Sequence, residues 1–369
     1  MNDFSNHLLR RVSFADIQGW QSDDHAAALS AFQRSSTEIM TTAHGFKRSA
    51  MFGGQLEDWI EVCKKALLAK APKEFFEQRF IPFSVTDPVK PQGLFTGYYE
   101  PEAEGSLMPT AEFLVPIYRK PLDLKALQNG DESQADLKYG RIENGKPTAY
   151  FTREEIEHGA LSTKGLEIVW LKSWVDAFFI HVQGSGRIRL ANGEIIRLAY
   201  AAKNGQPYTG IGKILLDRGV GTPQTMSMQL LRGWMKDHPT EARALMWNNK
   251  SYIFFRQINV SDANLGALGA QQVNLTPLRS LAVDRSIWMF GTPIWIDTKT
   301  PPEAPNGAET FRHLLIAQDT GTAIKGHVRG DVYWGWGDNA AICAGHMKSP
   351  GAMTVLLPAI VAKKLLLVP

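Results

Sequence analysis

The sequence predicts a mainly β protein with a helical N-terminal part and a small closed barrel. Apolar residues recur at helical spacing in the first part of the chain, but from GLFTGYYEPE (93–102) onward the apolar period shifts towards two and strand formers multiply. Many short strands between turn signals are typical of a closed barrel rather than a parallel sheet with crossover helices. A chain of 369 residues also has room for two domains, one of which can interrupt the other.

Three helices are expected in the N-terminal part, over 23–40, 55–70 and 72–80. Each has apolar residues on one face, and Asp23 or Asp24 is the expected N-cap of the first. The second helix ends before a proline, which opens the third.

The middle of the chain is expected to alternate strands with turns. Its predicted strands are EFLVPIYRK (112–120), LEIVWL (166–171), AFFIHVQGSGRIRL (177–190) and GEIIRLAYAAKNG (193–205), with hairpin turns at NGK (144–146) and ANGE (191–194). Two helices follow, IGKILLDRG (211–219) and TMSMQLLRGWMKDH (225–238). The last third returns to short strands at 251–258, 280–290, 292–298, 313–320, 331–337 and 352–358.

Composition narrows the function classes. Forty Lys and Arg against thirty-seven Asp and Glu leave no basic footprint of a nucleic-acid partner. The ten tryptophans suit stacking on sugar rings, although most are expected in the core. Residues 1–20 lack the apolar run of a signal peptide, and no stretch is long enough to span a membrane. The chain is therefore expected to be either cytosolic or a mature form whose export signal is absent.

Most familiar catalytic devices are missing from the sequence. It contains no GxSxG elbow, HExxH helix or P-loop, and QGSGRI (183–188) lacks the third glycine and the helix of a dinucleotide site. The nine histidines have no ligand spacing, so His181, His313 and His346 are expected to be structural, and neither a metal nor a cofactor is expected. Cys63 and Cys343 form no metal pattern, and a disulfide between them stays open.

The carboxylates remain as candidates. Asp331 follows Gly330, and its apolar and aromatic flank of Val332, Tyr333 and Trp334 would desolvate the carboxyl group and raise its pKa. A raised pKa is the condition for a general acid at neutral pH. The alternative is an Asp that caps a turn through local hydrogen bonds.

Asp319 in QDTGT has the same alternative, and Asp284 could simply pair with Arg285. The concentration of these carboxylates around glycine-rich turns, with Lys325 and aromatic residues nearby, favours a site. A conventional glycosidase uses two carboxylates. If the substrate supplies its own nucleophilic hydroxyl, one residue can protonate the leaving oxygen and then deprotonate that hydroxyl. The sequence permits either chemistry.

Seven stretches, in the same order, resemble the membrane-bound lytic murein transglycosylase A family over almost the whole chain. They are TGYYEP (96–101), VQGSGRI (182–188), AAKNGQPYTGIGKILLDRG (201–219), MSMQ (226–229), VDRSI (283–287), GTPIWID (291–297) and AQDTGTAIKGHVRGDVYWGWG (317–337). The resemblance implies non-hydrolytic cleavage of the β-1,4 bond between N-acetylmuramic acid and N-acetylglucosamine in peptidoglycan. The muramic acid C6 hydroxyl closes on C1 and leaves a 1,6-anhydro end.

The resemblance also implies the fold and the catalytic residues. Residues 1–102 and 251–369 would form the helical part and a double-psi β-barrel, and 103–250 a smaller inserted β-rich domain, with a glycan groove between the two. Asp331 would be the single catalytic acid and base, with Asp319 beside it as a hydrogen-bonding or tuning group. Substrate contacts would come from a larger set: Tyr98, Tyr99, Glu100, Gln183, Ser185, Lys203, Asn204, Tyr208, Asp284, Lys325 and Trp334.

The expected partners are peptidoglycan glycan strands and the cell-wall synthesis machinery, with a monomeric protein in the periplasm, associated with the outer membrane. Two features depart from the family pattern. Neither cysteine stands where a lipid-modified N-terminal cysteine would be, and Thr322 occupies the place of a second glycine after QDTG, where a β-branched residue would shift Asp319.

Two other functions stay open. The first is a glycoside hydrolase that uses water, with Asp331 as acid and Asp319 or Asp284 as base. The second is a non-catalytic protein that binds cell-wall glycan; a buried acid argues against it, because a binding groove gains nothing from the cost of desolvating one.

Overall fold

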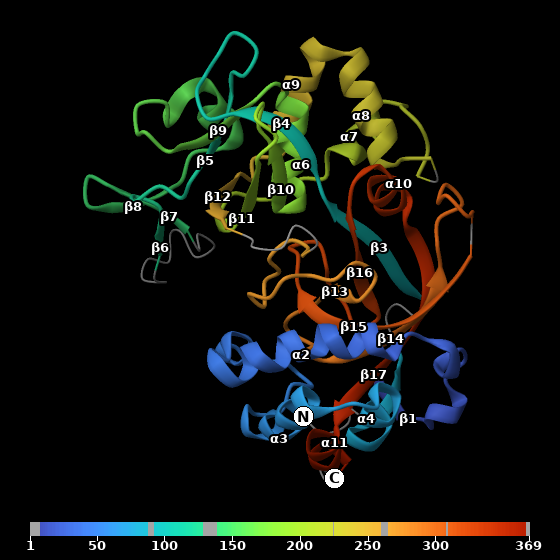
Figure 1. Cartoon of the computed structure of the whole chain (residues 1–369). Coiled ribbons are helices and arrows are strands. Elements are labelled where there is room, and N and C mark those ends of the chain that lie inside the picture. The colour runs from blue at the N-terminus through green and yellow to red at the C-terminus, as the bar shows by residue number, and fades with distance from the viewer. Residues whose placement is uncertain are drawn as a thin grey trace. The chain divides into compact units, whose positions relative to one another are not determined.

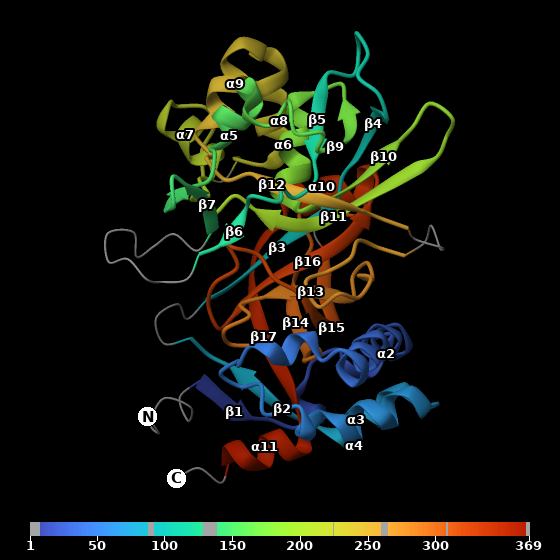
Figure 2. The same cartoon turned by 90° about the vertical axis from the view of Figure 1, so that its left-hand side faces the viewer.

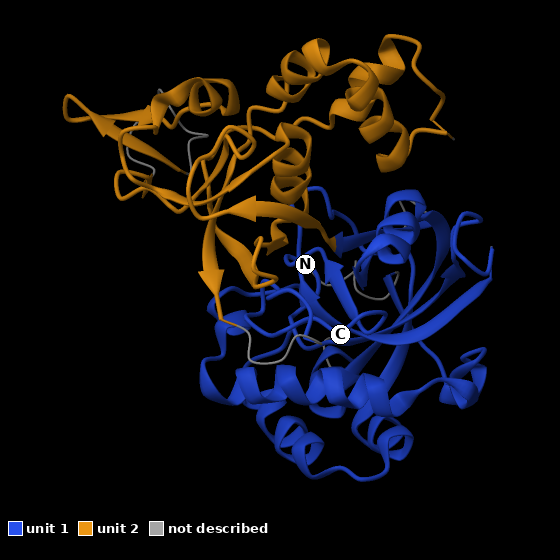
Figure 3. Ribbon diagram, turned by 45° about the horizontal axis from the view of Figure 1, so that its top comes forward, with its two compact units in different colours: residues 1–99, 264–369 blue, residues 100–263 orange. Residues whose placement is uncertain are grey.

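The computed structural model describes residues 8–87, 92–127, 139–223, 225–259, 265–307 and 309–366. The chain divides into two compact units, which are coloured in Figure 3. Unit 1 contains residues 1–99 and 264–369, and unit 2 contains residues 100–263.

Unit 1 is built on a closed ring of six strands (Figure 1). Around the ring they are β3 (Gly93–Glu100), β16 (Arg329–Trp336), β13 (Ser280–Val283), β15 (Thr310–Asp319), β14 (Pro293–Lys299) and β17 (Lys348–Pro358). The long strand β17 closes the ring, because it pairs with β3 near its start and with β14 further along. Its last residues pair with β2 (Phe80–Val85), which continues the sheet to β1 (Leu9–Arg11). This is the mainly β fold with a closed barrel that the strand pattern predicted, and the double-psi type of barrel is what the family resemblance implied.

Helices cover the barrel of unit 1. They are α2 (His25–Thr41), α3 (Glu57–Leu68), α4 (Pro72–Arg79), α10 (Asp338–His346) and α11 (Ala359–Leu366), with short 3-10 turns η1 (Phe14–Asp16), η2 (Trp20–Ser22) and η3 (His44–Lys47). In Figures 1 and 2, α2, α3, α4 and α11 gather at one side of the barrel. The three predicted N-terminal helices are confirmed, and Asp24 is the N-cap of α2, accepting from the Ala27 amide at 3.0 Å.

The other candidate cap, Asp23, fastens the start of α2 to the barrel instead. Its carboxylate accepts hydrogen bonds from the Arg279 guanidinium at 2.8 and 2.9 Å, from His313 Nδ1 at 2.8 Å and from the Leu314 amide at 3.0 Å. The Asp23 side chain is fully buried. Burial alone would raise its pKa, but these hydrogen bonds and the charge of Arg279 outweigh burial and hold the pKa of Asp23 well below its usual range.

Unit 2 contains a six-stranded sheet whose two edge strands meet at a bridge between Arg119 and Phe255. In sheet order the strands are β12 (Ile253–Ile258), β11 (Ile195–Lys203), β10 (Ser185–Arg189), β4 (Glu102–Ser106), β9 (Glu167–Leu171) and β5 (Val115–Tyr118). A three-stranded sheet contains β6 (Lys125–Ala126), β7 (Tyr139–Glu143) and β8 (Lys146–Ala149). The helices are α5 (Arg153–Glu155), η5 (Ile156–Ala160), α6 (Trp174–Gln183), α7 (Ile211–Asp217), α8 (Met228–Asp237) and α9 (Pro239–Trp247).

One predicted strand of unit 2 was wrong. Residues 177–190 do not form one strand: α6 occupies the first half, and β10 begins at Ser185. Ser173 caps the helix, and Gly184 ends it in the left-handed region at φ 75°. The helix is apolar on several faces because it packs against the sheet on one side and against α7 and α9 on the other, so its sequence lacks the polar stripe of a surface helix.

The structure also contains a predicted hairpin turn, helices that the sequence did not predict and two free cysteines. The NGK turn joins β7 and β8 with Asn144 at φ 51° and Gly145 at φ 77°, the pattern of a type I′ hairpin. Helices α9, α10 and α11 were not predicted. Cys63 and Cys343 are free and buried. Over the described residues, no helix is both long and apolar enough to cross a membrane.

Candidate active site

Asp331 lies inside strand β16, not in the turn before it. It pairs in register with Ala282 of β13. Its neighbours Gly330 and Val332 are buried and face the barrel interior, so Asp331 lies on the opposite face and is half-buried. Oδ1 of Asp331 accepts a hydrogen bond from the Thr96 hydroxyl of β3 at 2.5 Å.

Asp319 is the last residue of β15 and reaches the same face through a β-bulge. The ladder pairs Leu281 with Ala317 and then Ala282 with Asp319, so Gln318 is the extra residue. In a regular strand Asp319 would point to the same face as Ala317, two residues earlier, and the bulge turns it to the opposite face. Gln318 is fully buried and is held by bonds to Ser280 at 2.6 Å and to the Ala31 carbonyl at 2.8 Å.

The carboxylate of Asp319 has three hydrogen-bond donors. Oδ1 accepts from the amides of Ala270 and Thr320, both at 2.9 Å, and Oδ2 accepts from the Tyr98 hydroxyl at 2.9 Å. Thr322 does not have a positive φ and is exposed. The backbone angle of Thr322 is therefore unstrained and gives no support to the expected shift of Asp319.

Both carboxyl groups are harder to ionise than a free aspartate. Burial raises the pKa of Asp331, against the opposing effects of the Arg329 guanidinium and the Thr96 hydrogen bond. Burial raises the pKa of Asp319 to about 6, against its two amide bonds and the Tyr98 bond, and the charge of Asp331 adds to the rise. The prediction that the flank of Asp331 raises its pKa agrees with this direction.

Aromatic rings line the region beside Asp319. Tyr98 packs against Tyr333 with ring centroids 5.2 Å apart, and the Tyr333 hydroxyl accepts from the Ala267 amide at 3.2 Å. Burial, together with the charge of Asp319, raises the pKa of Tyr98 well above its usual value. Tyr98 therefore remains a hydrogen-bond donor to Asp319 over the physiological range.

Asp284 and Lys325 form a neighbouring cluster at the end of β13. Asp284 accepts from Ser286 Oγ at 2.7 Å, from the Gly326 amide at 3.1 Å and from Lys325 Nζ at 3.3 Å. Arg285 instead donates to the carbonyls of Gly45 and Arg48, so the expected pairing of Asp284 with Arg285 is not what fixes this carboxylate. Lys325 is mostly exposed.

Trp334 is half-buried and packs on its own barrel. Its ring lies over Gly97, where an added Cβ would come within 2.6 Å of the indole nitrogen, and that nitrogen lies 3.3 Å from Met347 Sδ. This contact gives Trp334 a structural role next to Thr96. A sugar contact remains a prediction.

Two of the predicted contact residues of unit 2, Asn204 and Glu100, have structural partners. Asn204 is fully buried and donates to the carbonyls of Phe151 and Lys250 at 2.8 and 2.9 Å. Glu100 is buried against Arg197 at 2.6 Å and Arg187 at 3.9 Å. In the same unit Ser185 is buried, Gln183 and Lys203 are half-buried, and Tyr208 is exposed, whereas Tyr99 is buried and belongs to unit 1.

Two residues beside Asp331 were not predicted, Thr96 and Arg329. Arg329 lies two positions before Asp331 on the same strand, and Arg329 Nη2 donates to Thr96 Oγ1 at 2.8 Å. Alternation along a strand places residues i and i+2 on one face, so this rule alone could have found Arg329. Thr96 lies in the motif TGYYEP, but nothing in the sequence indicates its contact with a residue 235 positions later.

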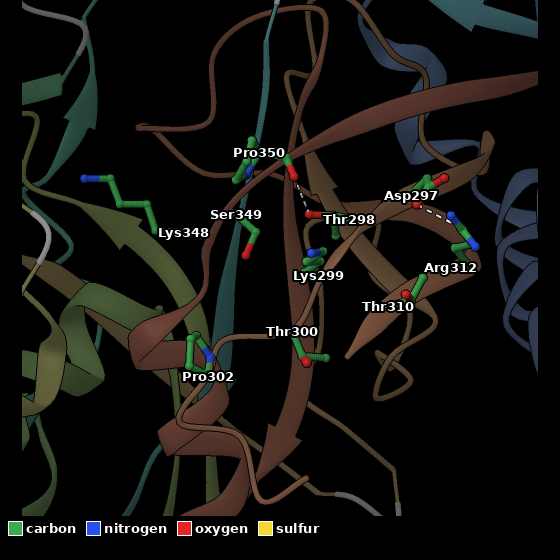
Figure 4. Close-up of a pocket in the computed structure, with 10 residues that line it drawn as sticks. All are labelled: Asp297, Thr298, Lys299, Thr300, Pro302, Thr310, Arg312, Lys348, Ser349 and Pro350. Atoms are coloured by element: carbon green, nitrogen blue, oxygen red, sulfur yellow. Dashed lines mark hydrogen bonds and ion pairs between the residues drawn. The ribbon is translucent and has the colours of Figure 1, made fainter. Parts of the chain in front are cut away.

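A separate hollow of about 480 Å³ lies on the barrel, lined by residues of β14, β15, β17 and the loop after β14 (Figure 4). Its lining includes Lys299, Arg312 and Asp297, and Arg312 Nε lies 3.0 Å from an Asp297 oxygen. Lys348 also belongs to the lining but extends away from the other residues in Figure 4. None of the predicted site residues lines this hollow.

Two carboxyl groups with raised pKa lie on one face of a closed barrel. Such groups can donate a proton near neutral pH, so the site is that of a protein class that performs acid–base chemistry. Two family models match the chain: "MltA specific insert domain" over residues 94–256 and "3D domain" over residues 279–357. The chain belongs to the membrane-bound lytic murein transglycosylase A family.

Similar proteins agree with this assignment. The crystal structure of a membrane-bound lytic murein transglycosylase from Agrobacterium tumefaciens has a TM-score of 0.87 and 35% identity, covering 97% of this chain and 99% of that one. E. coli MltA with bound chitohexaose has a TM-score of 0.67 and 28% identity, covering 93% and 91%. Membrane-bound lytic murein transglycosylase A of Vibrio cholerae is 33% identical over 70% of this chain, and the matched part spans only 63% of that relative's length.

Proposed function

We propose that this protein is a peptidoglycan lytic transglycosylase that cleaves the β-1,4 bond between N-acetylmuramic acid and N-acetylglucosamine without water. Asp331 protonates the glycosidic oxygen as the bond to C1 breaks. The same carboxylate then accepts the proton of the muramic acid C6 hydroxyl as O6 bonds to C1. The proton given in the first step is recovered in the second, so no water is consumed.

The observation that carries the proposal is that the two carboxylates accept different numbers of hydrogen bonds from the protein. Asp319 and Asp331 are both paired with Ala282, on opposite sides of it. Two strand spacings, about 10 Å, separate their backbones. Asp319 has three donors on its two oxygens, whereas among the described residues one hydrogen bond, from the Thr96 hydroxyl, reaches Asp331. Asp331 therefore has an oxygen to offer a substrate, and Asp319 is better placed to tune it.

The same separation keeps a second function open. An inverting glycosidase holds its two carboxyl groups apart by roughly 6.5–9.5 Å to admit water, and backbones about 10 Å apart are compatible with such a spacing of the carboxyl groups. Against this reading, a general base must present an oxygen to water, and both oxygens of Asp319 already accept protein hydrogen bonds.

The relatives support the substrate class. The E. coli structure carries chitohexaose, a β-1,4-linked amino-sugar chain, and the names of the relatives include the words membrane-bound and murein. We propose the same substrate class for this chain, so that it binds peptidoglycan strands. Unit 1 is then the catalytic domain, predicted at 1–102 and 251–369. Unit 2 is the substrate-binding domain, predicted at 103–250. The periplasmic location, the glycan groove, the contact residues, the monomeric state and the association with the synthesis machinery remain predictions.

Digestion of purified sacculi tests the proposal. Wild type is expected to release 1,6-anhydromuropeptides, identified by mass spectrometry, and Asp331→Asn to release none while keeping its unfolding temperature. Asp338→Asn, at an exposed aspartate of α10, is the matched control and is expected to cleave normally. Reducing ends would identify a hydrolase instead, and the absence of products from wild type would leave a glycan-binding protein.

A further inference from the structure

Thr96 connects a guanidinium to the candidate acid. Arg329 Nη2 donates to Thr96 Oγ1 at 2.8 Å, and Thr96 Oγ1 donates to Asp331 Oδ1 at 2.5 Å. A guanidinium only donates, and a hydroxyl has one proton. Ionised Asp331 only accepts, so the direction of both hydrogen bonds is then fixed: Arg329 to Thr96, and Thr96 to Asp331.

The guanidinium is anchored by backbone atoms and not by the carboxylate. Arg329 Nη1 donates to the carbonyl of Gly330 and, at 3.4 Å, to that of Leu94. Within the described part of the chain, no ion pair of 4.0 Å or less joins Arg329 to Asp331. Direct contact would strongly favour the ionised carboxylate and oppose its use as an acid. The inserted hydroxyl keeps the positive charge close but not in contact.

We propose that Arg329 and Thr96 are positioning residues that confine the acidic proton of Asp331 to Oδ2 and stabilise Oδ1 when that proton has left. This inference rests on the proposed function, because it assigns a purpose to the protonation of Asp331. With Oδ1 accepting from Thr96, the neutral carboxyl group carries its proton on Oδ2, the oxygen left to meet the glycosidic bond. Arg329 polarises the Thr96 hydroxyl, which strengthens its bond to the carboxylate.

Other charged or titratable groups also face Asp331. Asp319 comes from β15, Tyr98 from β3 and Tyr333 from β16 itself, and the charge of Asp331 raises the pKa of both Asp319 and Tyr98. Lys348 of β17 is paired in register with Thr96. Removing Arg329 or Thr96 leaves all four in place, so a change in the pH profile can be assigned to the Arg329–Thr96 pair.

The variants Thr96→Val and Arg329→Met test the inference. Val keeps the shape of Thr but has no hydroxyl, and Met keeps the stem of Arg without its charge. Each should lower the rate of anhydromuropeptide release from purified sacculi about tenfold, the effect of one hydrogen bond to a charged group. Because each also removes an interaction that favours ionised Asp331, the alkaline side of the pH–rate profile should move to higher pH.

The double variant separates a relay from two independent effects. If Arg329 acts through Thr96, Thr96→Val with Arg329→Met should be no slower than Thr96→Val alone, within about twofold. Thr96→Ser, which keeps the hydroxyl, should restore the wild-type rate and profile. Arg11→Met, at an exposed arginine of β1, is the matched control and should change neither.

The outcomes distinguish the two proposals. An unchanged pH profile in both single variants, with normal unfolding temperatures, overturns the inference while the function stands. Multiplicative effects in the double variant overturn the relay. If Asp331→Asn still releases anhydro products, Asp331 is not the acid and this inference fails with that assignment. If wild type releases reducing ends or no products, the proposed function itself fails.

Discussion

Asp319 and Asp331 occupy equivalent positions on the two strands that flank β13. Each is paired in register with Ala282, so the two carboxylates lie on one face with one small residue between their strands. Like charges at this range disfavour joint ionisation, and the charge of Asp331 adds to the raised pKa of Asp319. The two groups therefore titrate as a coupled pair, which keeps a proton on the pair at a higher pH than a free aspartate could.

Asp319→Asn removes one member of this pair. Since the repulsion is mutual, the pKa of Asp331 should fall, and the alkaline side of the pH–rate profile should move to lower pH. Release of anhydromuropeptides from sacculi over a pH series measures this. Asp319→Glu keeps the charge and serves as control. A shift of the asparagine variant to higher pH would contradict the coupling.

Gly97→Ala should loosen the strand that carries Thr96. An added Cβ would come within 2.7 Å of the Trp334 ring and of the Ala344 backbone, so either the ring or α10 must move. Overpacking of this kind costs about 1–3 kcal/mol. Urea unfolding at neutral pH gives the loss, and the cleavage rate should fall with it. Gly233→Ala, in α8 with open space around its Cβ, is the control and should be neutral or slightly stabilising.

The two aspartates could be found from the sequence because glycines and aromatic residues mark their segment and because the family motifs align there. Their geometry could not. The bulge at Gln318 depends on side-chain bonds to Ser280 and to α2, which periodicity does not show. Likewise, Thr96 meets Asp331 only because β3 closes the ring beside β16.

The same limit explains the wrong strand over 177–190 and the partners of Glu100 that the sequence did not indicate. Helix α6 packs on two sides, so its apolar run looked like a strand. Glu100 looked like a contact residue in its motif, yet its carboxylate is buried between Arg197 and Arg187, partners that lie far along the chain. Pairing between distant segments decides such cases, and local patterns do not contain it.

The two cysteines should be unreactive in the folded protein. Both thiols are buried, and burial raises the pKa of Cys63 to about 11. The thiolate is the reactive form, so a disulfide reagent should label neither thiol without denaturant and both with it. Rapid labelling of one thiol in buffer would contradict the burial of that site.

Asp23→Asn should show how the N-terminal helices are held to the barrel. The substitution leaves the Arg279 guanidinium buried without its carboxylate partner, at a cost of about 3–5 kcal/mol. Asp24→Asn is the matched control, because asparagine is as good an N-cap as aspartate, and it should change stability little. The folded-state pKa of Asp23 lies below the unfolded value of 3.8, so the wild-type advantage is complete above about pH 5 and falls as the pH drops through the unfolded pKa. Urea unfolding should therefore give a difference between wild type and Asp23→Asn that is about 1 kcal/mol smaller at pH 3 than at pH 7. A difference that stays constant over this range would mean that the ionised carboxylate is not what stabilises the contact.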